Sequence, residues 1–443
     1  MFSTTDTIVA VATPRGRGAI GMVRLSGSES LPIAARLTGR SSPFTARMAT
    51  LCRVGRLDEV VVTAFKAPRS YTGEDVVELT AHGSPVILDG LVAAAVELGA
   101  RHAAPGEFTF RAVLNGRLDL VQAEAVSDLI QSATPLQAAT AFDQLDGTLT
   151  ARIREVERGL FELQALIEAS LDFPDEGYRF IEGSEAVARI DGLLAEVEAL
   201  VRDGRTGRVV REGARVVLVG RRNAGKSTLF NRLVGFDRAI VSEVEGTTRD
   251  MVSEEIDLGG LSVRLVDTAG LGAPGDAIEA EGMDRARGAS TAADLTVVVL
   301  DGSRRVGRGE EHVVDSLEPI RRLVVVNKID LPAVDGTADV NAVRVSGVTG
   351  EGIAALRAAI AGRLRGGESS QERPAVSNVR HVARLAEASE ALSRARRACG
   401  QGVPEEFVLA EFSTAASALQ QITGERAPDE LLAEIFSRFC IGK

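Results

Sequence analysis

The octapeptide GRRNAGKS, residues 220–227, follows directly on the apolar run VVLV at residues 216–219 and fits the pattern GxxxxGK[ST] at every fixed position. A strand, Gly-rich turn and helix in this order let backbone N–H groups wrap a phosphate at the helix N-terminus. Lys226 would then reach the β- and γ-phosphates of a nucleotide, and the Ser227 hydroxyl would ligate Mg²⁺. The stretch predicts a P-loop within a mostly parallel, doubly wound α/β sheet.

Two later motifs indicate which nucleotide is bound. An apolar strand precedes DTAG at residues 267–270, which supplies a carboxylate for the Mg²⁺ site and a Gly N–H for the γ-phosphate. A second strand precedes NKID at residues 327–330, where Asp330 can accept hydrogen bonds from the N1–H and 2-amino group of guanine, which adenine does not offer. The order predicts a Ras-like G domain that binds GTP, and it disfavours an ATPase. The expected contacts are Asn223, Ala224, Gly225, Lys226, Ser227, Thr228, Asp267, Thr268, Ala269, Gly270, Asn327, Lys328, Asp330 and Ser346, although Gly347 replaces the usual alanine after Ser346.

The hydrolytic machinery differs from that of Ras-type enzymes. GTTRD at residues 246–250 lies where a switch loop is expected, and Thr248 is the expected Mg²⁺ ligand. Leu271 stands where Ras-type enzymes place the glutamine that orients water. Asn223 offers an oxygen near the bridging phosphates that could hold a monovalent cation such as K⁺. Glu279 could position the water, although its spacing alone favours a solvated charge on a switch helix.

Composition limits the class of protein. The chain has 443 residues, of which 45% are hydrophobic and 26% charged, and this predicts a soluble globular protein of about two to four domains. No apolar run reaches the roughly 18 residues of a membrane span and the N-terminus lacks a signal-peptide layout, so we expect a cytoplasmic location. The three cysteines form no CxxC pair, and neither disulfides nor a zinc site is expected. The formal charge of -11 argues against a broad nucleic-acid coat but leaves room for a local RNA site.

Lysine is scarce in this chain. Only four of the 51 basic residues are lysines, at positions 66, 226, 328 and 443. A compact ammonium and a planar guanidinium are not interchangeable at a tight phosphate site, which gives a lysine a reason to persist there. Lys66 reads as a surface charge, and a final-residue lysine such as Lys443 is by default a frayed, solvated one.

The sequence before the G domain divides into two regions. Residues 1–117 carry short apolar runs broken by Gly, Pro and Ser, and they predict a small α+β domain with a single helix at residues 86–98. Residues 118–212 predict a helical domain, because apolar side chains recur at three- and four-residue steps. We expect the Gly- and Arg-rich residues 204–213 to end this helical region. The helical face is formed by Leu149, Ile153, Val156, Leu160, Leu163 and Ile167, and a second by Val187, Ile190, Leu194, Val197 and Val201.

The G domain is predicted over residues 213–366, and a Gly-, Ser- and Pro-containing linker follows it. Residues 375–443 are helical in pattern, with helices expected over residues 379–399 and 405–439. The simplest architecture inserts the G domain into a helical domain that the C-terminal segment completes. The predicted fold class is therefore multidomain, with an N-terminal α+β domain, a helical domain and an inserted α/β G domain.

Further distinctive segments are spread along the chain: Gly16 to Gly27, YTGED at 71–75, PGEF at 105–108, DFPDE at 172–176, GTTRD at 246–250 and FCIGK at 439–443. Through these segments the chain resembles, from end to end, the tRNA modification GTPase family MnmE (also TrmE), one of the TrmE-Era-EngA-like GTPases.

The resemblance implies a K⁺-dependent GTPase that works with an FAD-dependent partner, MnmG (also GidA), in a heterotetramer or larger complex. The pair would add an aminomethyl or carboxymethylaminomethyl group to C5 of the wobble uridine of certain tRNAs. The added carbon would come from a tetrahydrofolate derivative, bound as 5-formyl- or methylene-tetrahydrofolate. The resemblance also implies homodimerisation through the N-terminal, folate-binding domain, and K⁺-dependent pairing of G domains.

The resemblance assigns roles to single residues. Asn223 matches a K⁺ ligand, together with Ser242, Val244 and Thr247, of which Ser242 and Thr247 also count as GTP contacts. Ser227 and Thr248 match the Mg²⁺ ligands, and Glu279 matches the catalytic glutamate that orients water beside the catalytic Lys226. Arg24, Glu78, Arg117 and Lys443 match the folate-binding positions, with Arg117 where the family often has lysine. Cys440 reads either as a small buried hydrophobic residue or as a reactive thiol near the folate or uridine, and it is a catalytic candidate on the second interpretation.

Two rival hypotheses remain open. An Era-type regulatory or ribosome-assembly GTPase would bind RNA without modifying it, but it has no need of a folate-like N-terminal domain or an FCIGK tail. A folate enzyme with a vestigial GTPase conflicts with the intact nucleotide motifs.

Overall fold

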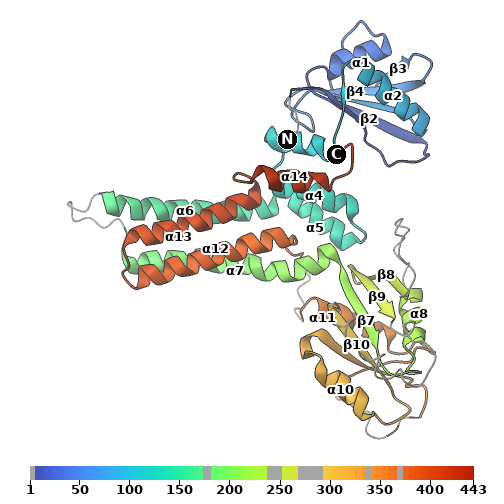
Figure 1. The fold of residues 1–443 in the computed structure, drawn as a ribbon, viewed down its shortest axis with the longest axis vertical. Coiled ribbons are helices and arrows are strands. Elements are labelled where there is room, and N and C mark those ends of the chain that lie inside the picture. The colour runs from blue at the N-terminus through green and yellow to red at the C-terminus, as the bar shows by residue number, and fades with distance from the viewer. Residues whose placement is uncertain are drawn as a thin grey trace. The chain divides into compact units, whose positions relative to one another are not determined.

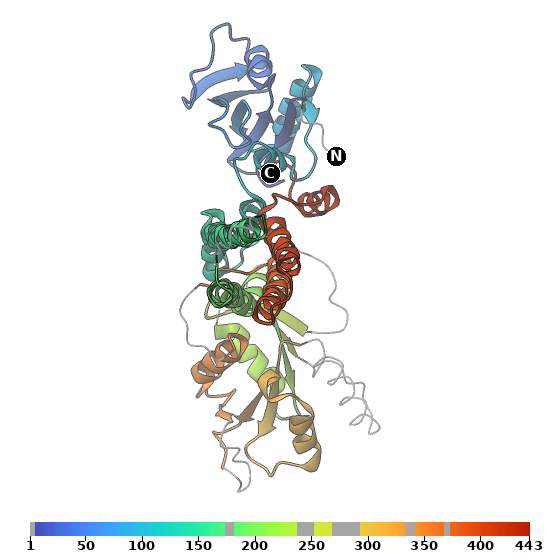
Figure 2. The ribbon, with the colours of Figure 1, turned by 90° about the vertical axis from the view of Figure 1, so that its left-hand side faces the viewer.

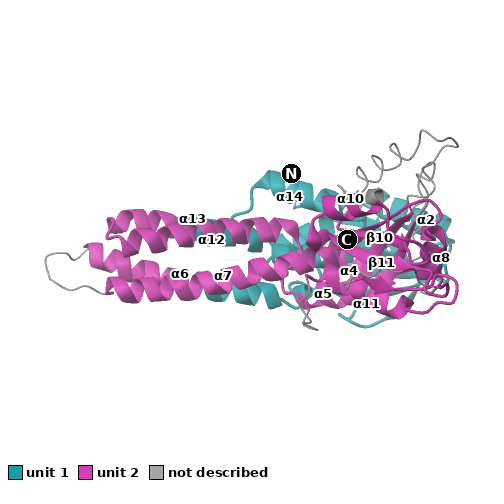
Figure 3. Ribbon diagram, turned by 90° about the horizontal axis from the view of Figure 1, so that it is seen from below, with its two compact units in different colours: residues 1–127, 144–157, 413–443 teal, residues 128–143, 158–412 magenta. Residues whose placement is uncertain are grey.

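The computed structural model describes residues 5–172, 181–236, 252–267, 293–332, 334, 342–366 and 373–443. The chain divides into two compact units, which Figure 3 colours separately. Unit 1 comprises Met1–Ser127, Gln144–Glu157 and Ser413–Lys443, and unit 2 comprises Asp128–Asp143 and Arg158–Phe412. The C-terminal residues therefore fold with the N-terminal ones.

A six-stranded sheet forms the centre of unit 1 (Figure 1), in the order β3-β4-β5-β2-β1-β6. All neighbouring strands are antiparallel except the pair β1 and β6. Side chains alternate between the faces, so Val23 and Leu25 enter the main core while Arg24 and Ser26 lie on the opposite face. The strands are β1 (Ile8–Val11), β2 (Ile20–Ser26), β3 (Thr50–Val54), β4 (Asp58–Phe65), β5 (Val76–His82) and β6 (Arg101–His102).

Three helices accompany this sheet, α1 (Ser30–Thr38), α2 (Pro85–Glu97) and α3 (Glu107–Leu114). Helices α1 and α2 bury apolar side chains such as Ile33 and Leu91 against one face of the sheet. The prediction of a single helix before residue 117 is therefore wrong, since residues 86–98 correspond to α2 alone. Helices α1 and α3 have nine and eight residues, about two turns, which is too short for an apolar periodicity to be recognised.

The first predicted apolar face, within residues 149–167, is buried. Leu149, Ile153 and Leu163 are fully buried, and the other three residues of that face are at most 4% exposed. Of the second predicted face, Ile190 and Val197 are buried, and Val187, Leu194 and Val201 are only half-buried. Long helices run alongside one another in Figures 1 and 2, with α7 and α12 packed together in unit 2. The helices are α4 (Leu120–Gln131), α5 (Pro135–Leu145), α6 (Thr148–Asp172), α7 (Gly183–Glu212), α12 (Val379–Gly400), α13 (Glu405–Thr423) and α14 (Asp429–Ser437).

Helix α7 corrects the expectation that residues 204–213 end the helical region, because it continues to Glu212. Its glycines serve close packing instead of termination. A Cβ at Gly207 would lie 1.7 Å from the carbonyl oxygen of Val376, and one at Gly204 would lie 2.3 Å from Cγ2 of Val382. The chain that returns from the G domain therefore passes directly over α7, where a larger side chain would exclude it.

The single helix expected over residues 405–439 is in fact two. Gly424 follows α13 with a φ of 94°, and a Cβ there would lie 2.8 Å from Cβ of Leu120. Pro428 then forms the N-cap of α14. Buried apolar residues occur on both sides of the break, such as Leu419 on α13 and Phe436 on α14, so periodicity alone does not reveal it.

The G domain in unit 2 has a second six-stranded sheet, in the order β12-β11-β10-β7-β9-β8. Only β8 and β9 pair antiparallel, so the predicted mostly parallel sheet is confirmed. The elements are β7 (Ala214–Val219), α8 (Lys226–Phe236), β8 (Val252–Leu258), β9 (Leu261–Asp267), β10 (Leu295–Asp301), α10 (Arg308–Ser316), η3 (Pro319–Arg321), β11 (Arg322–Asn327), β12 (Val343–Arg344) and α11 (Ile353–Leu364).

Both faces of this sheet are covered. Alternate residues of β7 enter different cores, Val216 on the side of α8 and α11 and Val217 on the side of α10. Strands buried on both faces read as continuous apolar runs, as residues 216–219 do. Within the described part of the chain, no helix is both long enough and apolar enough to cross a membrane.

Candidate functional site

The P-loop connects β7 to α8 in unit 2. Gly220, Asn223 and Gly225 have φ angles of 153°, 64° and 91°. A Cβ at Gly220 would lie 2.3 Å from the Val299 carbonyl oxygen, and one at Gly225 would lie 2.3 Å from Nδ2 of Asn327. Glycine is therefore needed at both fixed positions of the motif, for backbone conformation and for space.

Lys226 begins α8 and is only 8% exposed. Its ammonium donates to the carbonyl oxygens of Gly220, at 2.8 Å, and Arg221, at 2.9 Å. Burial lowers the pKa of this ammonium, and the carboxylate of Asp267 works against that shift. A partly desolvated cation at a helix N-terminus is suited to an anionic ligand, because a phosphate would restore the charge interactions that burial removes.

The Asn327 side chain links the nucleotide motifs to one another. It is 2% exposed, and its Nδ2 donates to the Ala224 carbonyl of the P-loop at 2.9 Å. Its Oδ1 accepts from the backbone N–H of Gly347 at 3.0 Å. Next to it, the hydroxyl of Ser346 donates to Oδ1 of Asp330 at 2.5 Å. The phosphate-binding loop and the two candidate base-binding loops are thus brought together.

Asp301 also belongs to this site, although none of the sequence motifs contains it. It ends β10 and lies opposite Asn327 in the parallel register of β10 and β11. Lys328 has a φ of 66°, and its Nζ lies 2.7 Å from Oδ2 of Asp301. Burial works to raise the pKa of Asp301, but Lys328 and Ser303 outweigh it and hold the pKa below its usual range. The available signal was an aspartate at the carboxyl end of the apolar run 295–300.

The remaining nucleotide candidates fall into two groups. Ser227 and Thr228 follow Lys226 on α8 and are exposed, as is Asn223, while Asp267 is 5% exposed at the end of β9. The switch candidates lie outside the described residues, and these are Ser242, Val244, Thr247, Thr248, Thr268, Ala269, Gly270 and Glu279.

A second candidate site lies in unit 1, on the sheet face opposite α1 and α2. Arg24 and Glu78 are directly opposite each other on β2 and β5. Both Nε and Nη2 of Arg24 donate to Oε1 of Glu78, at 3.0 and 2.8 Å. The guanidinium carbon lies 5.3 Å from the ring centroid of Tyr71 and 5.8 Å from that of Phe108. These contacts hold the arginine in one orientation.

The C-terminal tail reaches this pair. Nη1 of Arg24 donates to the Gly442 carbonyl at 3.5 Å. Lys443 is half-buried, and burial and Arg24 lower the pKa of its ammonium while Glu78 and Cys440 oppose the shift. The default expectation that Lys443 is a frayed charge is therefore wrong. Cys440 is exposed, so the interpretation as a buried hydrophobic residue is also wrong.

Arg117 is the most separate of the four folate candidates. Its Nε donates to the Ser70 carbonyl at 3.1 Å, in the loop that also carries Tyr71. A buried arginine that the sequence analysis did not single out, Arg111, anchors this region through ion pairs with Asp6, Glu74 and Glu107. The segments YTGED and PGEF therefore meet through Arg111, which ties the loop to α3.

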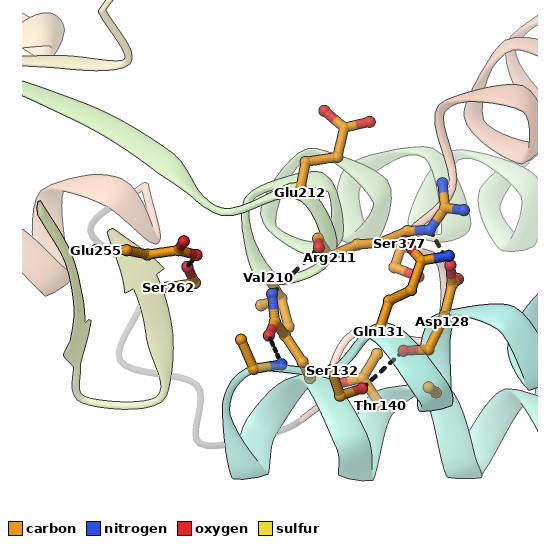
Figure 4. A pocket seen from close by; sticks show the side chains of 13 residues that line it. Asp128, Gln131, Ser132, Thr140, Val210, Arg211, Glu212, Glu255, Ser262 and Ser377 are labelled. Atoms are coloured by element: carbon orange, nitrogen blue, oxygen red, sulfur yellow. Dashed lines mark hydrogen bonds and ion pairs between the residues drawn. The ribbon is translucent and has the colours of Figure 1, made fainter. Parts of the chain in front are cut away.

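A polar cavity of about 450 Å³ lies elsewhere in unit 2 (Figure 4). It is lined by α4, α5, the end of α7 and the hairpin of β8 and β9, and none of the candidate site residues lines it. Arg211 pairs with Asp128 at 2.7 Å beside it, and Thr134 donates to the Gly260 carbonyl at 2.7 Å. The cavity marks the place where the hairpin meets the helical segment, and it is distinct from the nucleotide motifs.

Two other features of the described residues do not form a binding site, and these are the arginines of α12 and the potential metal ligands. Arginines on α12 are engaged in ion pairs, Arg384 with Glu387, Arg394 with Glu411 and Arg396 with Asp191. These partly exposed ion pairs are typical of a solvated helix face. In the described ranges, no group of three or more His, Cys, Asp or Glu side chains is arranged to hold a metal ion.

Known proteins resemble the whole chain. A family model described as GTP-binding protein TrmE N-terminus matches residues 7–117, and one described as MnmE helical domain matches residues 120–440. A protein of Koribacter versatilis named tRNA modification GTPase MnmE is 43% identical, over 99% of both chains. One of the same name from Thiobacillus denitrificans is 42% identical, over 99% of this chain and 98% of its own.

A solved structure, the G domain of the T. maritima FeoB iron transporter, is 24% identical. It covers 34% of this chain and 98% of its own, with a TM-score of 0.26. A score this low adds nothing to the fold described above.

Proposed function

We propose how this chain works on the premise that it belongs to the MnmE family of tRNA modification GTPases. It is a GTP hydrolase of tRNA modification. Our proposal is that hydrolysis depends on K⁺, and that with an FAD-dependent partner the enzyme adds an aminomethyl or carboxymethylaminomethyl group to C5 of the wobble uridine. The observation that carries the nucleotide site is the double hydrogen bonding of Asn327 to the P-loop and to Gly347.

The hydrolytic step transfers the γ-phosphoryl group of GTP to water. Water attacks phosphorus, the bond to the β–γ bridging oxygen breaks, and GDP leaves. Lys226 would neutralise charge that builds up on the phosphates, and Asp330 and Ser346 would hold guanine. Ser227 and Thr248 would hold Mg²⁺, with the Asp267 carboxylate behind these ligands, and the ion supplies electrostatic stabilisation when bound. Asn223, Ser242, Val244 and Thr247 would hold K⁺, and Glu279 would orient the attacking water.

A one-carbon folate fits the residues of unit 1. A pterin edge presents N–H donors that suit the carboxylate of Glu78, and the glutamate tail of folate presents carboxylates that suit a guanidinium or ammonium. Arg24 and Lys443 lie beside Glu78, and Arg117 anchors the adjoining loop. We propose 5-formyl- or methylene-tetrahydrofolate as the ligand, with Cys440 as an accessible thiol near it.

Membership of the family supports a proposal about the partners. We propose a homodimer formed through the N-terminal domain, a heterotetramer or larger complex with MnmG, and cytoplasmic tRNA as the substrate. The proposed domains are residues 1–117, 118–212, 213–366 and 375–443. The matches to the TrmE N-terminus and MnmE helical models favour this function over that of an Era-type assembly GTPase. None of the contacts described above supports the Era-type alternative.

GTP hydrolysis measured in KCl and in NaCl at equal ionic strength tests the proposal. We expect strong stimulation by K⁺, loss of activity with Glu279→Ala, and a shift from guanine to xanthine nucleotides with Asp330→Asn. Glu311→Ala, an exposed position on α10, is the matched control and should retain full activity. A rate that ignores the cation, together with a harmless Glu279→Ala, would refute the roles of Asn223 and Glu279 but leave the P-loop GTPase intact.

A further inference from the structure

Arg232 lies at an unexpected point in the nucleotide site. It follows Lys226 by six residues on α8, and it is not part of any of the motifs discussed above. Its Nε donates to the Gly347 carbonyl at 3.2 Å, and its Nη2 donates to the Val348 carbonyl. The guanidinium carbon lies 3.7 Å from where a Cβ would stand on Gly350. The side chain therefore holds the loop that follows β12 against α8.

The hydrogen bonds of Arg232 complete a closed cycle of contacts between the P-loop, α8 and the loop after β12. From Ala224 the chain leads through α8 to Arg232, which holds the carbonyl of Gly347. The N–H of the same Gly347 donates to Asn327, and Asn327 donates back to Ala224. The peptide units on either side of Gly347 are thus fixed, one through its carbonyl and one through its N–H, by groups from the P-loop helix and from β11. Their orientation decides where the loop can contact a base.

The neighbouring residue transmits this constraint to guanine recognition. Ser346 is fully buried, and its hydroxyl both donates to Asp330 and accepts from the N–H of Thr349. If the carbonyls of residues 347 and 348 were released, the turn at residues 346–350 would lose the contact that holds it against α8. Asp330 would then lose the hydroxyl that fixes its carboxylate toward the N1–H and 2-amino group of guanine.

We propose that Arg232 is a positioning residue for guanine specificity, which it exerts by holding the loop at residues 346–350 against the P-loop helix. The inference rests on the proposed role of Asp330 and Ser346 in binding the base. An arginine suits the task because its planar fork reaches two carbonyls at once, whereas a lysine ammonium would hold one of them at a time. The residue acts on affinity for the base and has no part in the chemistry at the γ-phosphate.

The test compares guanine with hypoxanthine, which lacks the 2-amino group. Binding of GDP and IDP is measured for the full chain, for Arg232→Ala and for Arg232→Lys, together with kcat at saturating GTP. We expect Arg232→Ala to weaken GDP binding about tenfold and IDP binding about threefold, and kcat to change less than about twofold. Arg232→Lys should recover part of the lost affinity.

A matched control separates positioning from a general loss of stability. Arg322 also donates to two carbonyls, those of Val314 and Leu317, but at the far end of β11 from the base-binding loops. Arg322→Ala should lower the Tm as much as Arg232→Ala while leaving the ratio of GDP to IDP affinity unchanged. The inference is overturned if Arg232→Ala weakens GDP and IDP equally, or if it lowers only the Tm. Asp330→Asn is run in parallel, because failure to shift toward xanthine nucleotides would reject the base site itself.

Discussion

Replacing Gly442 by alanine tests whether the C-terminal tail is a built part of the folate site. Gly442 has a φ of 95°, and a Cβ there would lie 2.3 Å from the Val11 carbonyl oxygen and 3.0 Å from Cα of Ala12. The left-handed conformation costs alanine about 1–2 kcal/mol. Val11 pairs with Val23 of β2, and the same strand pairs with β6 at Ile8 and Val9, so the strand resists the shift that would make room.

The tail should therefore lift away from the sheet, and with it Lys443 from the pair formed by Arg24 and Glu78. A penalty of about 2 kcal/mol corresponds to a factor of about 30 in the population of the docked tail. If folate binds only when the tail is docked, affinity for 5-formyl-tetrahydrofolate should fall by up to about 30-fold. Isothermal titration calorimetry on the purified chain measures this directly.

Gly39→Ala is the control, because Gly39 has a φ of 64° in the same unit and no atom lies within 4 Å of its Cβ position. It should cost roughly 1 kcal/mol of stability and leave folate binding unchanged. Lys443→Met should weaken folate binding as well, and combining it with Gly442→Ala should cause little further loss. Unaltered folate affinity in Gly442→Ala would refute the role of the docked tail.

Two further predictions concern stability. Gly207→Ala should destabilise the chain by about 3 kcal/mol or more, because the added methyl group would overpack against the Val376 carbonyl. Gly192→Ala, where no atom lies within 4 Å of the Cβ position, should stabilise the chain by up to about 1 kcal/mol. Urea unfolding of both variants checks this prediction, and equal effects would contradict it. Burial and the Glu425 carboxylate raise the pKa of Glu157 from 4.5 to about 7, so the folded state holds the proton more tightly and the free energy of unfolding falls as the pH rises through that window. Glu157→Gln should remove this fall, measured by urea unfolding at about pH 5 and about pH 8, and a pH dependence equal to that of the parent chain would reject the assignment.

The elements of the G domain were largely predictable because their signals are local. A strand buried on both faces is a run of apolar residues, and the residues at the carboxyl ends of such strands carry the chemistry. Each of the runs 216–219, 263–266 and 323–326 falls inside a strand of the sheet. The period of the apolar residues also gave the buried face of α6 correctly.

Glycine in α7 was misread because composition does not reveal what packs against a residue. Gly204 and Gly207 lower helix propensity by about 1 kcal/mol each relative to alanine, which argued for a helix end. Their function depends on Val376 and Val382, more than 150 residues later in the sequence. The role of Arg232 is hidden for the same reason, since its partner Gly347 lies on another element. Long-range contacts of this kind become visible only in the folded chain.

The scarcity of lysine in the sequence predicted where the functional sites lie. Lys66 is exposed, and the other three lysines each lie at a candidate site. Lys226 donates to two P-loop carbonyls, Lys328 pairs with Asp301, and Lys443 lies half-buried beside Arg24. In each case the ammonium occupies a confined place that a planar guanidinium, with five donors to satisfy, would not fit in the same way. Three of the four lysines therefore occupy positions at which the shape of the cation matters, and the exposed Lys66 is the exception.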